Sequence, residues 1–392
     1  MIWLTALLSV YPLAPSAVRS AGGIVYLDRN ANGTRDAGEP GIAGVAVSDQ
    51  VTVVVSGADG SFRLDPLGGF GLVFVSVPSG YRAQGPFWRT VDSTGEPKLE
   101  FGLVRAPLPD DFTFIHASDT HIDERSRPRT VRLRALIDSI RPAFVLVSGD
   151  LVRDALRVSE STATACYETY RAEIAKIAVP VWSAPGNHEI FGIERDQSKV
   201  SADHPLYGRR MYRHHLGPDY YSFNTGGIHF VALNSVDIDD TRYYGHVDSV
   251  QVAWLERDLA QVPASTPVIT FNHIPFFGTG EQWGGYMEGG PAPSIITVNG
   301  RAGFRHVVSN AQEILAAVRG HPYPLALGGH YHQREILRYE LRGQPTEFHN
   351  AAAVVGPSDH RGGRMVSGIS VYHVRHSRPD GGRFVPLGID PP

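Results

Sequence analysis

Five apolar segments of this chain are each followed by polar residues of the types that bind metals, and this pattern constrains the fold most. Phe112–Ala117 is followed by Asp119-Thr120-His121. The four later segments are followed by Gly149-Asp150, Gly186-Asn187-His188-Glu189, His273 and His330-Tyr331-His332. Because functional groups in open α/β sheets gather beyond the carboxyl ends of the strands, we expect these side chains to meet at one edge.

Helical patterns alternate with the apolar segments from Phe112 onward. Apolar residues recur at the spacing of one helix face between Leu133 and Ile140. The pattern predicts further helices over Ala163–Ile177, Val250–Leu259 and Ala311–Val318. It predicts further strands over Ala143–Ser148, Val179–Ala184, Tyr220–Asn224, Ile228–Leu233 and Val268–Asn272. Such strand–helix alternation is typical of an α/β layer.

The preceding part of the chain follows a different pattern. From Gly23 to about Arg105, short β-type segments alternate with turns rich in Gly, Pro and Asp, without helical spacing. Strands at this spacing predict a small all-β sandwich, which we place at residues 22–105. The Pro-rich segment 106–111 is predicted to be a linker.

Residues 1–21 are predicted to be a signal peptide for export. The apolar stretch from Ile2 to Ala14 is interrupted by Pro12 and followed by small residues, as expected near a signal-peptidase site. It falls short of the ~20 residues that a membrane span needs, so no transmembrane span is expected here. The alternative for this stretch is a buried N-terminal strand.

Composition limits the chemistry of any metal site. The 392 residues include 17 His but only one Cys, Cys166. An intrachain disulfide needs a second Cys, and a thiolate zinc or iron–sulfur site needs several. A transition-metal site must therefore use imidazole, carboxylate and amide oxygen, which suit Zn, Mn or Fe. The net charge of −4 gives no signature of nucleic-acid binding.

The ligand types and their spacing suit a pair of divalent ions. Two ions ~3.5–4 Å apart can share a hydroxide and hold both oxygens of an in-line phosphoryl displacement. A ligand shared by two ions should be a carboxylate at a rigid strand end, and Asp150 meets this requirement. Residues two positions apart, such as Asp119 and His121, can reach the same side of an extended segment.

Taken together, the motifs resemble those of the calcineurin-like metallophosphoesterase family. That family carries D-x-H, G-D, G-N-H-E or G-N-H-D, a single His and G-H-x-H in this order, and this chain has each element. The resemblance covers roughly residues 112 to 375. It implies a four-layer α/β/β/α sandwich at residues 112–376, followed by a tail at residues 377–392.

By position, the resemblance implies a role for each residue of the motifs. One ion would be bound by Asp119, His121 and His332, the other by Asn187, His273 and His330, with Asp150 between them. His188 would not bind metal but would stabilise or protonate the leaving oxygen. An imidazole can do so near neutral pH because its ordinary pKa is ~6.5. The catalytic residues would thus be His188, Asp150 and Asn187.

One departure separates the chain from the purple acid phosphatases of the same superfamily. Those enzymes use D-x-G as the first motif and place a Tyr three residues after the bridging Asp. Here the first motif is Asp119-Thr120-His121, and Arg153 stands at the position of the Tyr. A tyrosinate–Fe(III) site is therefore not expected.

Two segments are predicted to recognise the substrate. Arg125 and Arg127 follow the first motif and could hold a phosphate through bidentate contacts or lie in solvent. The aromatic, Gly-rich loop after the fourth motif is predicted to form a substrate wall through Phe277, Trp283 and Tyr286. The alternative for this loop is core packing.

A loop of calcium-binding type lies near the start of the predicted sandwich. It matches the pattern D-x-N-x-N-G-x5-E through Asp28, Asn30, Asn32, Thr34, Asp36 and Glu39. Its β-like flanks exclude the helix pair of an EF-hand. The stretch through Gly41–Ser48 resembles bacterial Ig-like and Cna-B-like modules. We expect one structural calcium ion, with an ion-free turn as the alternative.

The sequence thus predicts an exported phosphoric ester hydrolase with two divalent ions. Its substrate would be a phosphomonoester or phosphodiester attacked by a metal-bound hydroxide. One alternative is a non-catalytic surface or matrix-binding protein with structural metals, which the intact motifs disfavour. Another is a two-metal hydrolase that acts on a different bond. The sequence leaves the oligomeric state open.

Overall fold

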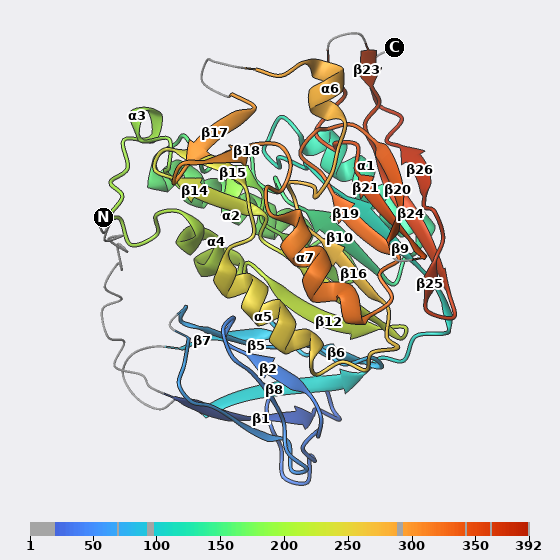
Figure 1. Ribbon diagram of the computed structural model, residues 1–392. Helices are drawn as coiled ribbons and strands as arrows, with labels where there is room; N and C mark the ends of the chain where they lie inside the picture. Colours follow the sequence, from blue (N-terminus) through green and yellow to red (C-terminus); the bar gives the residue numbers. More distant parts are fainter. Residues whose placement is uncertain are drawn as a thin grey trace, which may run out of the picture.

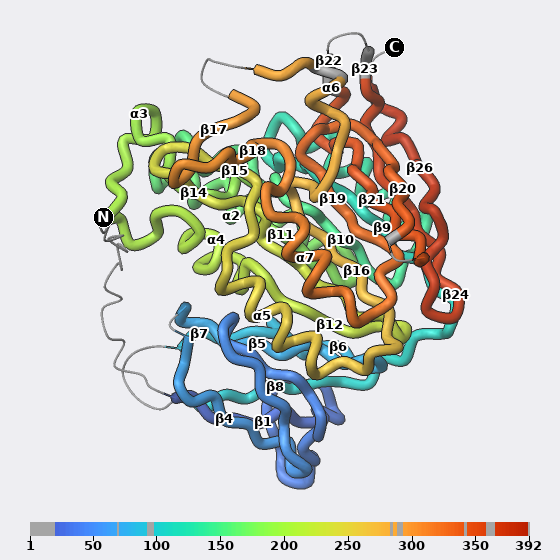
Figure 2. Tube along the Cα trace, in the orientation of Figure 1, coloured from blue at the N-terminus to red at the C-terminus, as the bar shows by residue number. Residues whose placement is uncertain are grey.

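The computed structural model describes residues 20–68, 70–91, 98–287, 293–341, 343–360 and 363–390, so the expected signal peptide lies almost entirely outside them. The chain forms a smaller β-sandwich and a larger α/β part that pack against each other (Figure 1). After β8, the chain leads from the sandwich into the α/β part (Figure 2). Among the described residues, no helix is both long and apolar enough to cross a membrane.

Two four-stranded sheets form the N-terminal part. Their strands are β1 (Ala21–Leu27), β2 (Ala46–Ser48), β3 (Val53–Val55), β4 (Ser61–Leu64), β5 (Leu72–Val75), β6 (Tyr81–Ala83), β7 (Trp88–Thr90) and β8 (Lys98–Arg105). One sheet has the order β4-β1-β8-β6 and the other β3-β2-β5-β7. Buried residues such as Val25, Phe62 and Val73 contribute to a hydrophobic core. This arrangement confirms the predicted all-β sandwich.

Two six-stranded sheets form the α/β part. The first contains β9 (Asp111–Ala117), β10 (Phe144–Ser148), β11 (Val181–Ala184), β24 (Gly368–Arg375), β25 (Arg378–Pro379) and β26 (Arg383–Pro386). Its order is β11-β10-β9-β24-β25, and β26 also pairs with β24. The second contains β12 (Tyr221–Thr225), β13 (Ile228–Ala232), β16 (Val268–Phe271), β19 (Leu325–Gly328), β20 (Glu335–Leu341) and β21 (Gln344–Asn350). Its order is β12-β13-β16-β19-β21-β20.

The two sheets pack face to face, and helices cover their outer faces. Phe114 stacks on Phe144 with 5.3 Å between ring centroids and meets the edge of Phe230 from the other sheet at 5.7 Å. The alternate residues Ile115 and Val145 join the core on the opposite side. The covering helices are α1 (Arg127–Ile140) and α2 (Glu160–Ile174) on the first sheet, and α5 (Ser249–Leu259) and α7 (Ala311–Ala317) on the second (Figure 1). The predicted four-layer α/β/β/α sandwich is thereby confirmed.

Polar caps, rather than the apolar spacing, decide where two of the helices begin. The side chain of Ser159 accepts a hydrogen bond from the Thr162 amide, so α2 begins before the predicted Ala163. The carboxylate of Asp248 likewise accepts from the Gln251 amide at 3.0 Å and starts α5. Such caps satisfy amides that have no partner within the helix.

Part of the predicted tail extends the first sheet. β25 and β26 both come from the segment 377–392, and each pairs antiparallel with β24. These strands are too short to show a clear alternation of apolar and polar residues. Pairing with the neighbouring β24 therefore decides their conformation.

Strand direction brings the predicted motifs to one edge of each sheet. In the first sheet β9, β10 and β11 run parallel and in register, so their carboxyl ends lie side by side. In the second sheet β13, β16 and β19 are parallel in the same way. The loops that leave these ends carry all five motifs.

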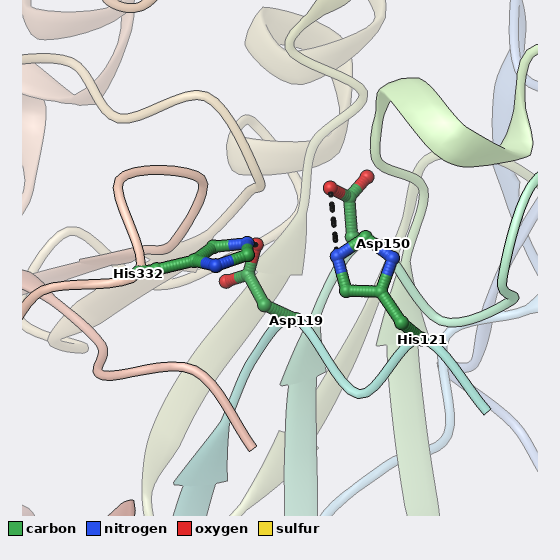
Figure 3. Close-up of side chains that lie close together, drawn as sticks. All are labelled: Asp119, His121, Asp150 and His332. Carbon is green, nitrogen blue, oxygen red and sulfur yellow. Dashed lines mark ion pairs between the residues drawn. The ribbon is translucent and has the colours of Figure 1, made fainter. Parts of the chain in front are cut away.

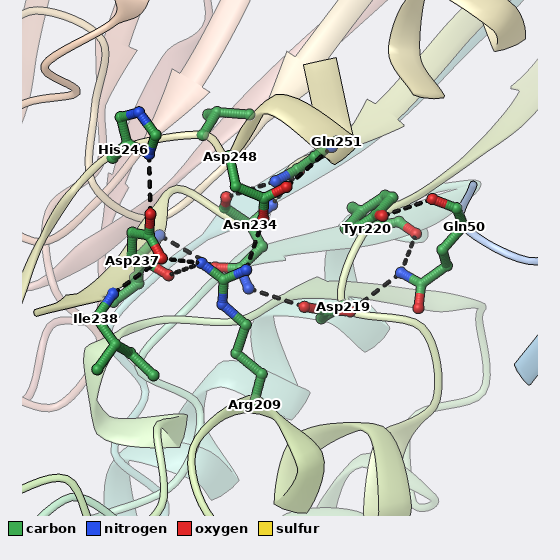
Figure 4. A network of polar contacts seen from close by, with 12 residues as sticks. Gln50, Arg209, Asp219, Tyr220, Asn234, Asp237, Ile238, His246, Asp248 and Gln251 are labelled. Atoms are coloured by element: carbon green, nitrogen blue, oxygen red, sulfur yellow. Dashed lines mark hydrogen bonds and ion pairs between the residues drawn. The ribbon is translucent and has the colours of Figure 1, made fainter. Parts of the chain in front are cut away.

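A polar network joins the sandwich to the α/β part (Figure 4). The buried Gln50 donates its Nε2 to Asp219 Oδ1 and to the Tyr220 carbonyl oxygen, both at 3.0 Å. The Tyr220 hydroxyl donates back to the Gln50 carbonyl oxygen at 2.5 Å. Asp219 also accepts from Arg213 Nε at 2.7 Å and from Asn234 Nδ2 at 2.9 Å. A loop of the sandwich therefore satisfies buried polar groups of its neighbour.

An aromatic contact forms the apolar part of the same interface. Trp254 of α5 is fully buried, with its ring centroid 6.3 Å from that of Phe74 and 4.9 Å from that of Tyr220. Its Nε1 donates to Ser48 Oγ at 3.0 Å. Because Phe74 and Ser48 belong to the sandwich, the two parts share one hydrophobic core.

We expect Trp254→Ala to lower the free energy of unfolding by ~3–5 kcal/mol, because it removes a buried aromatic ring at the shared core. Val250→Ala, at a 42% exposed position of the same helix, is the matched control and should change stability by less than ~0.5 kcal/mol. Denaturant titration should show one transition for both parts. Separate transitions of the wild-type sandwich and α/β part would contradict a shared core.

Candidate metal centre

Most of the predicted ligands have a left-handed backbone. Positive φ angles occur at five of the seven: Asp119, His121, Asp150, His330 and His332. Asp and His tolerate this region better than most residues, but it still costs ~1–3 kcal/mol at each position. The surrounding sheets must therefore hold these loops in place. Strain of this kind is typical of functional sites.

Four predicted ligands form a first cluster (Figure 3). One nitrogen or oxygen atom from each of Asp119, His121, Asp150 and His332 lies within 4.8 Å of the others. His332 Nε2 is 3.1 Å from Asp119 Oδ1. His121 Nε2 is 3.5 Å from Asp150 Oδ2. The first, second and fifth motifs thus meet at one point.

A second cluster uses the other oxygen of Asp150. Asp150, His273 and His330 place one ligand atom each within 4.8 Å of one another. His273 Nε2 lies 3.2 Å from Asp150 Oδ1 and 3.2 Å from Asn187 Oδ1. His330 Nδ1 lies 3.1 Å from His273 Nε2. Asp150 is therefore common to both clusters, and the third and fourth motifs complete the second.

Backbone groups hold Asp150 between the clusters. The His188 amide donates to Asp150 Oδ1 at 3.0 Å. A Cβ atom on Gly186 would overlap the backbone nitrogen and Oδ1 of Asp150, so this approach requires glycine. Glu189 Oε2 accepts from the Gly186 amide at 2.6 Å, and its Oε1 accepts from the amides of residues 151 and 152 at 2.8 and 2.9 Å. Glu189 therefore ties the second motif to the third.

The two imidazoles of the second cluster are oriented by their outer nitrogens. His273 Nδ1 lies 2.9 Å from the Ser148 carbonyl oxygen, which can only accept, so Nδ1 carries the proton. Its Nε2 is left to face Asp150. The outer nitrogen of His330 is Nε2, which lies 2.7 Å from Nδ1 of His306. Outer contacts of this kind are usual for histidines that bind metals.

Charge and burial set the protonation of the cluster. Burial raises the pKa of Asp150, but the imidazoles of His273 and His188 outweigh burial and hold this pKa well below its usual value. Burial, and then the neighbouring His188, lowers the pKa of His121 to about 3. Burial and His273 hold the pKa of His330 well below its ordinary value. Burial lowers the pKa values of His273 and His332, but Asp150 raises that of His273 to about 9 and Asp119 raises that of His332. Because a metal binds neutral imidazole, an ion would displace a proton from each of these two rings.

The donor set fits divalent transition metals. Within the described ranges, neither ring nitrogen of the buried His121 makes a hydrogen bond. Leaving buried polar atoms without hydrogen bonds is costly unless another partner satisfies them. A metal ion would satisfy His121 Nε2, which already faces Asp150. Imidazole, carboxylate and amide oxygen together suit Zn, Mn or Fe.

His188 lies at the edge of the clusters. Its Nδ1 is 2.8 Å from the Arg153 carbonyl oxygen and therefore donates to it. Its Nε2 is 3.9 Å from Asp150 Oδ2, which is too far for a hydrogen bond. The side chain is 22% exposed, whereas that of Asp150 is 4% exposed. His188 is thus more exposed than Asp150, while the backbone holds its Nδ1.

The residues predicted to contact substrate have different surroundings. Arg125 and Arg127 are exposed at the start of α1. The ring of Phe277 packs against Tyr339 and Phe348, with 5.6 and 4.9 Å between centroids. Core packing, the alternative interpretation, thus accounts for the contacts of this ring.

The rest of this loop lies over the last motif. A Cβ atom on Gly280 would overlap the ring of Tyr331, which stands between His330 and His332. Tyr286 is 53% exposed, and its hydroxyl accepts from Gln282 Nε2 at 3.2 Å. Trp283 belongs to the short helix α6 (Gly280–Gly284), but its side chain lies outside the described residues.

In the calcium-type loop, the carboxylates accept hydrogen bonds from amide groups of the same loop. Asp28 and Glu39 are buried, with 1% and 7% exposure. Asp28 Oδ2 accepts from the Gly33 amide at 2.8 Å, and Glu39 Oε1 accepts from the Arg29 amide at 2.7 Å. Asp36 Oδ2 accepts from the side-chain amides of residues 30 and 32, both at 2.8 Å. The first and last residues of the pattern are thus brought into one loop.

Comparison with protein families agrees with this geometry. A model of the calcineurin-like phosphoesterase family matches residues 112–334, which contain all five motifs. A model of the N-terminal domain of calcineurin-like phosphoesterases matches residues 29–105. The chain therefore belongs to the calcineurin-like phosphoesterase family, which confirms the resemblance found in the motifs.

Curated relatives match over shorter stretches. Purple acid phosphatase 13 of Arabidopsis thaliana is 33% identical over 108 residues, which are 26% of this chain and 18% of that protein. Purple acid phosphatase 15 of the same plant is 28% identical over 160 residues, which are 35% of this chain and 29% of that protein. The matches thus span less than a third of the length of either relative.

Solved structures with a similar chain course include two phosphatases. A dimetal phosphatase from Danio rerio is 16% identical, with a TM-score of 0.45 over 70% of this chain and 96% of that one. A purple acid phosphatase from yellow lupin seeds is 14% identical, with a TM-score of 0.44 over 88% of this chain and 68% of that one.

Two residues beside the clusters carry no role in the sequence analysis. Glu189 stands inside the third motif, where its place next to His188 is a visible signal. His306 has no such signal, because it lies 24 residues before His330 and follows no motif or regular spacing. Only the tertiary contact with His330 reveals it.

We expect Gly186→Ala to lower bound metal and turnover by ~10–100-fold, because the added methyl group displaces Asp150 from between the clusters. Gly320→Ala is the matched control, since a Cβ there would meet nothing within 4 Å. Metal content by mass spectrometry and a thermal melt of each variant check this result. Normal metal content in a folded Gly186→Ala protein would contradict the proposed position of Asp150.

Proposed function

We propose that this protein hydrolyses phosphate esters with two divalent ions, identified by ligand chemistry as Zn, Mn or Fe. The observation that carries the proposal is the buried carboxylate of Asp150, whose two oxygens face two separate groups of ligands. Membership of the calcineurin-like phosphoesterase family supports the same chemistry. Asp119, His121 and His332 would hold one ion, and Asn187, His273 and His330 the other.

The protein contributes position and charge to the reaction. When bound, a pair of ions neutralises the charge that develops on the phosphoryl group and lowers the pKa of water. The aligned strand ends hold the ligands, so little rearrangement is needed during the reaction. The Asn187 side-chain oxygen, 3.2 Å from His273 Nε2, adds a neutral donor to the second group.

His188 is proposed to protonate the leaving oxygen. Its Nδ1 is held by the Arg153 carbonyl oxygen, which leaves Nε2 on the side of Asp150. Its partial exposure allows contact with a substrate, unlike the fully buried His273. General acid catalysis by a residue in this position is worth ~10²–10⁴-fold in rate.

The substrate is proposed to be a phosphomonoester or phosphodiester whose leaving group lies beside His188. The close approach of Gly280 to Tyr331 supports a place for the predicted aromatic loop beside the last motif, and a contact of Tyr286 with substrate stays a prediction from the sequence. Arg125, Arg127 and Trp283 remain predictions from the sequence. The packing of Phe277 against two aromatic rings supports a structural role instead.

Removal of metal and of single side chains tests the proposal. We expect a chelator to abolish hydrolysis of chromogenic mono- and diesters, and added Zn, Mn or Fe to restore it. Asn187→Ala and His188→Ala should lower turnover by ~10²–10⁴-fold without unfolding the protein. His204→Ala is the matched control, because this side chain is 25% exposed and pairs with Glu160. Unchanged activity after verified metal removal would contradict the proposed mechanism.

We further propose one structural calcium ion in the loop from Asp28 to Glu39. Support comes from the twelve-residue pattern and from the burial of its two end carboxylates. Calcium at ~100 times its dissociation constant should stabilise the folded protein by ~2.7 kcal/mol. The Glu39→Gln variant should lose this response in a thermal melt, whereas Glu124→Gln should keep it. A wild-type melting temperature that ignores calcium would contradict this site.

Export from the cell is also proposed. The support is the apolar stretch before residue 15 and the small residues that follow it. This stretch precedes the first described strand, β1, which begins at Ala21.

A further inference from the structure

His306 contacts the outer nitrogen of a proposed metal ligand. His330 Nδ1 faces the second cluster at 3.1 Å from His273 Nε2. A ring that binds metal through Nδ1 must carry its proton on Nε2, which lies 2.7 Å from His306 Nδ1. His330 therefore donates to His306, and the proton of the neutral His306 ring belongs on its Nε2.

A carboxylate stands on the far side of His306. His306 Nε2 faces Glu281 Oε1 at 3.8 Å, which is too far for a direct hydrogen bond. Glu281 belongs to α6, and its Oε2 accepts from Ser294 Oγ at 2.6 Å. The order of groups is thus Glu281, His306, His330 and the second cluster. His306 thus stands where a carboxylate, a carbonyl oxygen or a water usually accepts the outer N–H of a histidine that binds metal.

The backbone around His306 is held from several sides. The hairpin of β17 (Ile295–Val298) and β18 (Arg301–Phe304) ends just before it. The Val308 amide donates to the Pro275 carbonyl oxygen at 2.9 Å. A Cβ atom on Gly245 would overlap the Val307 carbonyl group, so glycine allows this close approach.

Rings on three sides confine His330. Its ring centroid is 4.9 Å from that of His306, 4.9 Å from that of His273 and 6.1 Å from that of Tyr243. The guanidinium of Arg305 lies over the ring of Tyr243, 4.2 Å from its centroid. His330 therefore has little freedom to rotate once His306 accepts the hydrogen bond from its Nε2.

We propose that His306 is a positioning residue, which holds His330 in the tautomer and orientation that bind the second metal ion. This inference rests on the proposed function, because it requires His330 to be a metal ligand. His306 acts through His330 and need not touch the substrate. The hairpin from 295 to 304 then forms part of the support of the metal centre.

The test measures the affinity of each metal ion in the whole protein. Co²⁺ is titrated against a competing chelator, and its visible absorption reports the geometry of the bound ions. His330→Ala and His121→Ala identify which of the two dissociation constants belongs to which cluster. We expect His306→Leu to weaken the second ion by ~10–100-fold and to leave the first unchanged. His204→Leu, at a similarly exposed histidine, should change neither.

A pair of amide variants separates hydrogen bonding from packing. His306→Asn keeps an oxygen acceptor near the position of Nδ1, so we expect it to restore most of the affinity for the second ion. His306→Gln places its amide near the position of Nε2 and should not restore it. These two variants also keep the test decisive if His306→Leu does not fold.

Different results would contradict the role of His306 and the proposed two-metal function. A wild-type protein that binds no pair of ions would overturn the metal proposal together with this one. In the other case the wild-type protein binds two ions. If the folded His306→Leu and His306→Gln variants then bind both ions as tightly as the wild-type protein does, only the role of His306 is overturned. Equal losses in the Asn and Gln variants would also overturn it, because the acceptor at Nδ1 would then not matter.

Discussion

The buried carboxylate of Asp150 is the point on which the structure depends. Removing a charge from water is costly unless opposite charges or hydrogen bonds compensate for it. Here the compensation comes from both sheets: the His188 amide lies on a loop of the first sheet, and His273 follows a strand of the second. The site therefore exists only when the two sheets pack face to face. Their aromatic interior, with Phe114 against Phe230, fixes that packing.

The sandwich contributes to this rigidity from a distance. Its Gln50 donates a hydrogen bond to Asp219, which accepts one from Asn234. Gln251 and Asp248 then connect Asn234 to the partly buried Arg209 (Figure 4). Burial lowers the pKa of Arg209, but Asp237 and Asp248 outweigh burial and raise it, so this group stays charged. Asp237 lies in β14 (Val236–Asp239), which pairs with β15 (Arg242–Gly245). Because β15 carries Tyr243 to the edge of His330, the polar network borders the metal centre.

Much of the fold and of the candidate site follows from local patterns, and the exceptions have physical reasons. The strands that precede the motifs are strongly apolar because both faces are buried, so Phe112–Ala117 and Ala143–Ser148 are found within one residue of their ends. The helix starts differ because the caps Ser159 and Asp248 lie outside the apolar pattern. The position of Phe277 depends on Tyr339 and Phe348, which are distant in the sequence. No local pattern contains such contacts.

By itself, the sequence determined which residues can bind metal and in what order the strands deliver them. It could do so because ligand chemistry depends on residue type, and because strand ends are marked by the change from apolar to polar residues. Only the tertiary structure decided that the two oxygens of Asp150 face two separate groups of candidate ligands, that Gly186 must lack a side chain, and that His306 contacts the outer nitrogen of His330. These facts depend on distances between separate elements, and distances are set by the packing of two sheets rather than by neighbours along the chain.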